Sequence, residues 1–108
     1  MKNFTYYRPT SPEQAVGLLE NRWGNTELLA GGTDLLDLQK EYIAQPSRVV
    51  SLASVAQLQN VSISDRAVTL GAGMTLAAVA NHVSVKQHAA ALAQAAGQVG
   101  GPQIRNMG

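Results

Sequence analysis

Cysteine is absent from all 108 residues, so this chain forms no disulfide and holds no thiolate metal site or iron–sulfur cluster. A charge of one sign is lacking too, because the formal net charge is +1 and the eight Lys and Arg residues are scattered along the sequence. This distribution gives no support for a nucleic-acid or anionic-membrane partner. Any redox chemistry here would need an organic cofactor.

Long apolar runs are also missing. No segment is apolar over the length of a membrane span, and the first residues lack the apolar core of a signal peptide. We therefore expect no membrane partner and a cytoplasmic protein. Hydrophobic residues make up 45% and charged residues 14% of the chain, a balance typical of a folded globular domain or part of one.

The side-chain patterns of common catalytic and metal sites do not occur. There is no Ser–His–acid or Cys–His arrangement, and His82 and His88 have no carboxylate or histidine at metal-ligand spacing. Asp37 and Glu41 lie one helical turn apart beside Lys40, as on a solvated helix face. We expect neither a catalytic residue nor a metal site on this chain.

The first half predicts a strand–helix–strand unit with parallel strands. Ser11 is placed to cap a helix that begins at Pro12, and Gln14 is placed to complete a capping box. The apolar face of this helix is expected to end near Asn21. A short strand over 26–30 enters Gly31-Gly32, a helix follows from Leu35 to about Tyr42, and a second strand covers 48–52. The aromatic residues near the first helix are expected to be packing anchors: Tyr6, Tyr7 and Trp23.

The second half has a different spacing of apolar residues. Alternating apolar residues on both sides of 64–66 predict a hairpin, and Thr75 is placed to cap a helix from Leu76 to about His82. An alanine-rich helix is expected over roughly 87–99. The tail 100–108 has no regular period, and no internal domain boundary is expected before about Gly100.

The segment Leu29-Ala30-Gly31-Gly32-Thr33-Asp34-Leu35 is the most informative, because it puts two glycines and a hydroxyl between a strand and a helix. Glycine lets the backbone approach an anion closely, and successive N–H groups can donate to diphosphate oxygens. A plainer alternative stays open, in which the glycines only turn the chain and Thr33 or Asp34 caps the helix. Neither the Gly-x-Gly-x-x-Gly fingerprint nor the Gly-Lys-Ser/Thr ending of a P-loop is present.

Four segments in register resemble one known family. They are Tyr7-Arg8-Pro9-Thr10-Ser11-Pro12-Glu13-Gln14-Ala15, Leu28 to Leu36 with the glycine pair, Leu70-Gly71-Ala72-Gly73-Met74-Thr75, and Pro102-Gln103-Ile104-Arg105-Asn106-Met107-Gly108. Together they resemble the FAD-binding subunits of molybdopterin dehydrogenases, the group of xanthine, carbon monoxide and aldehyde dehydrogenases. The resemblance covers essentially the whole chain.

The resemblance implies an α+β fold with an α/β-like first lobe, in which a small sheet with the strand–helix–strand unit and the hairpin are flanked by helices. Residues 1–99 would form the first lobe of a two-lobed FAD-binding domain, and 100–108 the truncated start of the second. In the family a second glycine motif, usually Thr-Ile-Gly-Gly-Asn, follows this point. The fragment alone is therefore expected to be inactive.

The resemblance also implies the cofactor and its contacts. FAD would be bound through its diphosphate by the first glycine loop, and from the other side by the start of the second lobe, with Ile104 and Arg105 shaping the approach. For Arg105, an ordinary ion pair at the surface or in an interface is the alternative. The implied cofactor-binding residues are Leu29, Ala30, Gly31, Gly32, Thr33, Asp34, Leu35, Val99, Gly100 and Gly108.

The implied activity is that of an oxidoreductase in a heterotrimer. Electrons would pass from a molybdopterin-binding large subunit, through a small subunit with two 2Fe-2S clusters, to FAD and then to NAD or another acceptor. Two alternatives stay open: another two-lobed FAD-binding oxidase, or a non-catalytic remnant that only docks to partner subunits.

Overall fold

The computed structural model describes all residues from Met1 to Gly108, which form two compact units, Met1–Gln57 and Leu58–Gly108. A 3₁₀ helix, Ala56–Gln59, lies at the junction. This division falls between the two halves of the chain, and residues 100–108 belong to the second unit. The expected lobe boundary at Gly100 concerns a complete FAD-binding domain and stays a prediction.

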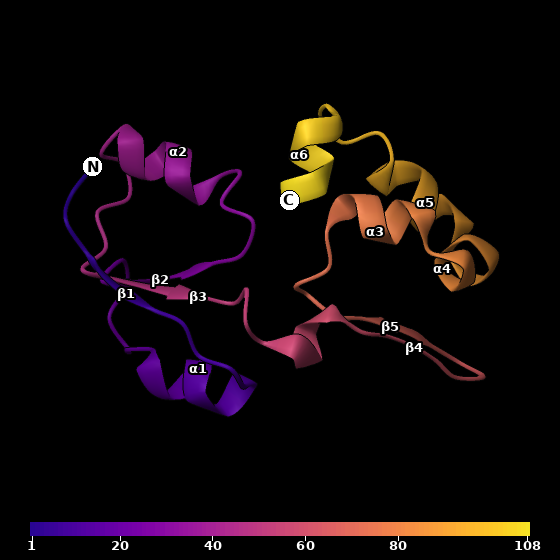
Figure 1. Ribbon diagram of the computed structural model, residues 1–108, viewed down its shortest axis with the longest axis horizontal. Coiled ribbons are helices and arrows are strands. Elements are labelled where there is room, and N and C mark those ends of the chain that lie inside the picture. Colours follow the sequence, from indigo (N-terminus) through magenta and orange to yellow (C-terminus); the bar gives the residue numbers. More distant parts are fainter. The chain divides into compact units, whose positions relative to one another are not determined.

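The first unit is a parallel sheet with a helix on each side. Strands β1 (Thr5–Tyr7), β2 (Thr26–Leu29) and β3 (Arg48–Ser51) are parallel, in the order β1-β3-β2. Helices α1 (Pro12–Leu18) and α2 (Leu35–Lys40) lie on opposite sides of this sheet (Figure 1). The predicted strand–helix–strand unit is therefore confirmed.

The central strand supplies the core of this unit. Val49 and Val50 are fully buried, and the core continues with Ala15 of α1 and with Val55. Gln39 of α2 is also buried, with 1% of its surface exposed, although no hydrogen-bond partner reaches either atom of its amide. No pattern in the sequence predicts a buried polar residue at this position.

The start of α1 follows the prediction and its end does not. Ser11 Oγ accepts a hydrogen bond from Gln14 N at 3.1 Å, as an N-cap does. Gln14 Oε1 accepts from Thr10 N at 3.0 Å, one residue before the capping-box partner that we expected. The helix ends at Leu18 rather than Asn21, because the chain turns to extended backbone at Leu19.

The expectation that the early aromatic residues are packing anchors is wrong for Trp23 and Tyr6. Trp23 has 99% of its surface exposed and Tyr6 has 50%. Trp23 lies in the turn between α1 and β2, just before Gly24, whose φ is 79°.

The helix that was expected to reach about Tyr42 ends at Lys40. Tyr42 lies beyond the end of α2, with φ 57° and with 57% of its surface exposed.

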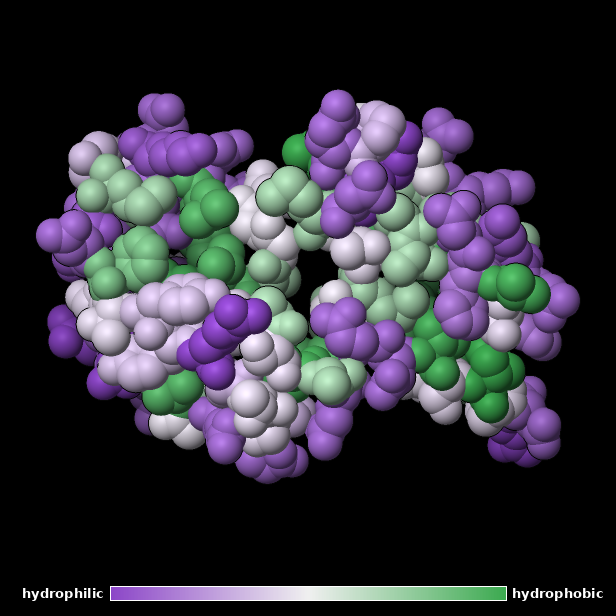
Figure 2. All heavy atoms as spheres, viewed as in Figure 1, coloured by the Kyte–Doolittle hydropathy of each residue, from purple (hydrophilic) through white to green (hydrophobic).

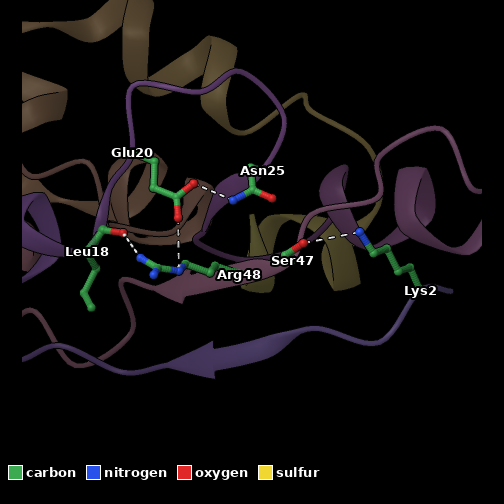
Figure 3. A network of polar contacts seen from close by, with 6 residues as sticks. All are labelled: Lys2, Leu18, Glu20, Asn25, Ser47 and Arg48. Carbon is green, nitrogen blue, oxygen red and sulfur yellow. Dashed lines mark hydrogen bonds and ion pairs between the residues drawn. The ribbon is translucent and has the colours of Figure 1, made fainter.

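A polar network centred on Arg48 ties the α1–β2 connection to the central strand (Figure 3). The Arg48 guanidinium donates to the Leu18 carbonyl at 3.2 Å and pairs with the Glu20 carboxylate at 3.2 Å. Glu20 also accepts from the Asn25 amide. Both ends of the segment that carries Trp23 are therefore fixed to β3.

The second unit packs four helices and a hairpin around one small core. Strands β4 (Val61–Ile63) and β5 (Val68–Leu70) pair antiparallel, so the predicted hairpin is confirmed. The helices are α3 (Leu76–Asn81), α4 (Val83–His88), α5 (Ala90–Ala96) and α6 (Pro102–Met107). The buried core consists of Val79, Val85, Ala93 and Ala96.

Two predictions for the second half are corrected. The single helix over 87–99 is wrong, because the chain breaks at Ala89 (φ −144°, ψ 58°) between α4 and α5. The tail is not irregular, because Gly101 and Pro102 begin α6.

The Thr75 cap is confirmed, since its hydroxyl accepts from Ala78 N at 3.0 Å. No helix of the chain combines the length and the apolar character needed to cross a membrane.

Candidate functional site

The glycine loop joins the end of β2 to the start of α2. After Leu29 the chain turns through Gly32, which has φ 78°, and reaches α2 at Leu35. The first turn of α2 is already closed from within the loop, because Leu36 N donates to the Gly32 carbonyl at 3.2 Å. The loop is therefore a tight left-handed turn leading into a helix.

Two separate features favour glycine at position 32. A φ of 78° is unfavourable for any residue with a Cβ atom. A Cβ built there would also lie 2.8 Å from Leu36 Cδ1 and 3.2 Å from Leu29 Cδ1. The side chains of Leu29 and Leu36 therefore occupy the space that a side chain at position 32 would need.

The loop keeps a run of backbone donors free. No hydrogen bond within the chain uses the N–H groups of residues 31–35, although Gly31, Gly32 and Thr33 are only half-buried and Asp34 is exposed. The Thr33 hydroxyl and the Asp34 carboxylate also make no hydrogen bond within the chain, so neither side chain caps α2. The capping alternative is therefore not what the structure shows.

The residues expected on the other side of the cofactor lie in the second unit, around α6. Gly100 has φ 54°, and a Cβ there would lie 3.1 Å from Ile104 Cβ. Arg105 Nη1 donates to the carbonyls of Gly100 at 2.7 Å and Val99 at 3.2 Å. Ile104 and Arg105 thus shape the 99–101 turn, and the ion-pair alternative for Arg105 finds no partner within the chain.

Gly108 closes the other end of α6. Its N–H donates to the Ile104 carbonyl at 2.7 Å, and its own carbonyl accepts from Leu76 N, the first residue of α3, also at 2.7 Å. Its backbone is therefore engaged in structural bonds.

The structure thus gathers the sequence-predicted residues into two groups. Leu29 to Leu35 form one continuous turn in the first unit, and Val99, Gly100 and Gly108 lie at the two ends of α6 in the second. The glycines of the third resembling segment have a packing role instead. A Cβ at Gly71 would lie 2.1 Å from the Leu58 carbonyl oxygen, so the chain segments approach too closely for a side chain.

Comparison with known proteins identifies this architecture. Residues 2–108 match the family described as the FAD binding domain in molybdopterin dehydrogenase. The chain is 34% identical to the nicotinate dehydrogenase FAD-subunit of Eubacterium barkeri over 100% of its length, and 31% identical to the carbon monoxide dehydrogenase medium chain of Hydrogenophaga pseudoflava over 97%. It covers 37% of each of these relatives, a little over a third of their length.

Solved structures agree with this result. Carbon monoxide dehydrogenase from Hydrogenophaga pseudoflava superposes with a TM-score of 0.92 at 31% identity, covering 98% of this chain and 37% of that one. Quinoline 2-oxidoreductase from Pseudomonas putida 86 superposes with a TM-score of 0.91 at 27% identity, covering 100% of this chain and 38% of that one. The chain belongs to the FAD-binding domain family of molybdopterin dehydrogenases. The predicted family, its cofactor FAD and the α+β fold are confirmed.

Proposed function

We propose that this chain provides the diphosphate-binding turn of the FAD site in the flavin subunit of a molybdenum-dependent hydroxylase. The observation that carries the proposal is the set of free N–H groups over residues 31–35 in an accessible turn. Successive backbone donors around a left-handed glycine form a concave anion site, and a diphosphate offers several acceptor oxygens. The residues present therefore fit the cofactor of the family.

Within this turn the side chains have different roles. The Thr33 hydroxyl is free to donate to a phosphate oxygen, as a neutral group with one O–H donor. The Asp34 carboxylate has the same sign of charge as the diphosphate, so it fits a sugar hydroxyl of FAD, from which it would accept a hydrogen bond. Leu29 and Leu35 flank the turn at the ends of β2 and α2.

Val99, Gly100 and Gly108 are proposed as further cofactor contacts in the second unit, Gly108 by close approach to its Cα, because its N–H and C=O are already bonded within the chain. Gly100 presents the backbone of a left-handed turn, and Arg105 holds that turn by its two carbonyl bonds. FAD, when bound, would accept and release electrons, while the polypeptide fixes its position and electrostatic surroundings.

The wider activity is proposed by analogy with the family. The complete protein is proposed to be an oxidoreductase subunit in the cytoplasm, assembled with a molybdopterin-binding large subunit and a small subunit with 2Fe-2S clusters. Electrons would pass from those clusters through FAD to NAD or another acceptor. The substrate would be oxidised on the large subunit and would not touch this chain.

A pair of substitutions at position 33 tests the diphosphate assignment. Thr33→Val keeps the side-chain shape and removes the hydroxyl, whereas Thr33→Ser keeps the hydroxyl. A hydrogen bond to a charged group contributes about 1.5–3 kcal/mol, so Thr33→Val should weaken FAD binding by roughly tenfold or more. The measurement is FAD retained per chain in the native protein, read from the visible flavin absorbance, together with titration of released FAD.

Thr33→Ser should retain FAD as the parent does. If Thr33→Val binds FAD as tightly as Thr33→Ser, the hydroxyl makes no such contact. A parent protein that folds and carries no flavin would contradict the whole proposal and support a remnant that only docks to partners.

A further inference from the structure

The outer edge of β2 is open. β2 is the last strand of its sheet and pairs only with β3. The carbonyls of Asn25 and Leu29 face β3, because they accept from Arg48 N at 3.1 Å and from Leu52 N at 2.9 Å. Since alternate residues of a parallel strand direct their backbone groups to opposite sides, Thr26 and Leu28 point theirs away from β3. No hydrogen bond within the chain uses these N–H and C=O groups.

Two surface hollows lie along this edge. One has a volume of about 450 Å³ and is lined by the end of α1, the 20–24 turn and β2. The other has a volume of about 680 Å³ and is lined by the same turn, β2, α2 and residues 43–45. Four residues line both hollows: Trp23, Gly24, Glu27 and Leu28. The hollows therefore meet at the open strand.

The walls of the hollows carry exposed apolar side chains. Trp23 has 99% of its surface exposed, Ile43 has 73% and Leu28 has 46%. Figure 2 shows hydrophobic residues at the surface between α2 and the sheet of this unit. Apolar surface around an unpaired strand edge favours association with another segment and, without a partner, promotes aggregation.

The charge of the larger hollow restricts the partner. Glu27 and Asp34 line it, neither has an ion-pair partner, and no Lys, Arg or His lines it, whereas Arg22 lines the smaller hollow. Two copies of β2 pairing antiparallel through Thr26 and Leu28 would place Glu27 opposite Glu27, and like charges directly opposite are destabilising. The edge therefore fits a segment with a basic residue better than it fits a second copy.

We propose that the open edge of β2 is the docking site for an extended, apolar segment of a partner subunit with a Lys or Arg facing Glu27. This segment adds a fourth strand, bonds to the backbones of Thr26 and Leu28, and places apolar side chains in the two hollows. The proposal rests on the proposed function only in taking the segment from a partner subunit of the same assembly.

Hydrogen–deuterium exchange gives the direct test. The amides of Thr26 and Leu28 are compared in the native assembly and in the isolated chain. Both should exchange at least roughly tenfold more slowly in the assembly, because they gain an acceptor there. The amides of Glu27 and Leu29 already face β3 and should change less. Equal exchange of Thr26 and Leu28 in the two samples would overturn the proposal.

Proline substitutions provide a matched pair of variants. Thr26→Pro removes an N–H that β3 does not use, and proline is tolerated on strand edges. Tyr6→Pro does the same at the opposite edge, since Thr5 N donates to the Ser47 carbonyl at 2.9 Å and Tyr6 N therefore points outward. Thr26→Pro should weaken partner association by roughly tenfold or more, as loss of one bond and a blocked edge imply. Tyr6→Pro should leave association unchanged.

A charge variant distinguishes the proposed basic partner segment from non-specific hydrophobic association. Glu27→Lys should weaken association more than Glu27→Gln, because it repels the proposed basic residue. Equal association for parent, Thr26→Pro and Glu27→Lys would overturn the proposal, and so would an isolated chain that dimerises with Thr26 and Leu28 protected. FAD content is measured in the same samples. A parent chain that associates with its partner but contains no FAD would count against the flavin proposal alone.

Discussion

Replacing the buried glutamine of α2 by methionine should stabilise the first unit. Gln39 has 1% of its surface exposed, and neither Oε1 nor Nε2 has a hydrogen-bond partner. Burying an unpaired polar group costs about 1–3 kcal/mol. Methionine has a similar length and shape, a similar helix propensity and no amide. Gln39→Met should therefore raise the free energy of unfolding by about 2 kcal/mol, from the middle of that range.

The assay is urea and thermal unfolding followed by far-UV circular dichroism. Trp23 fluorescence is a poor probe, because the indole is already 99% exposed in the folded chain. For a unit of this size a gain of about 2 kcal/mol corresponds to a rise in Tm of roughly 16 °C. Because the chain forms two compact units, the shift should appear in the transition of Met1–Gln57.

The matched control is Gln94→Met, which makes the same change at an exposed position of α5. It should change stability by less than about 0.5 kcal/mol, as exposed substitutions do. If Gln39→Met is no more stable than the parent while the control is neutral, the amide of Gln39 is not an unsatisfied group and the reasoning is refuted.

The other predictions concern glycine turns and helix caps. Gly24→Ala introduces only the left-handed strain, because no atom lies within 4 Å of its Cβ position, and should cost about 1–2 kcal/mol. Gly32→Ala adds the overlap with Leu36 to the same strain and should cost about 1–3 kcal/mol more in chemical denaturation; equal losses for the two variants would contradict the close packing. Thr75→Ala removes the cap of α3 and should cost about 1 kcal/mol in the unfolding of the second unit, and an unchanged midpoint would show that the cap contributes nothing.

Local signals in the sequence predicted most of the element starts. Ser11 with Pro12, and Thr75 before Leu76, specify helix starts through groups within three residues, so no tertiary information is needed. The parallel pairing of β2 and β3 followed from the helix between them. The same kind of signal, Gly101 before Pro102, marks the start of α6, where we expected irregular structure.

The breaks that were not predicted depend on packing. Alanine favours helix, so nothing local stops the chain at Ala89. After the break α4 and α5 pack against each other, and Val85 of α4 and Ala93 of α5 belong to the same buried cluster. The burial of Gln39 and the exposure of Trp23 likewise contradict the usual preferences of their side chains, so composition and periodicity give no indication of them.

The position of the candidate site could be predicted from the sequence, but the availability of its backbone N–H donors could not. A glycine pair after a strand indicates a tight turn, and Gly32 does adopt the left-handed conformation. Whether the amides of residues 31–35 are free depends on which carbonyls lie near them, and that requires coordinates. The role of Arg105 is similar, because its carbonyl bonds exist only once α6 has formed.

The Arg48 network has a consequence for the dynamics of the surface that it supports. It holds Leu18, Glu20 and Asn25, so the short segment between the last two has little freedom while the indole at its tip stays in water. Conformational entropy that a mobile loop would lose on association has here already been lost on folding. Any molecule that covers Trp23 thus meets an indole whose backbone is already anchored on both sides, and removing Arg48 would loosen that anchor without altering the chemistry of the side chain.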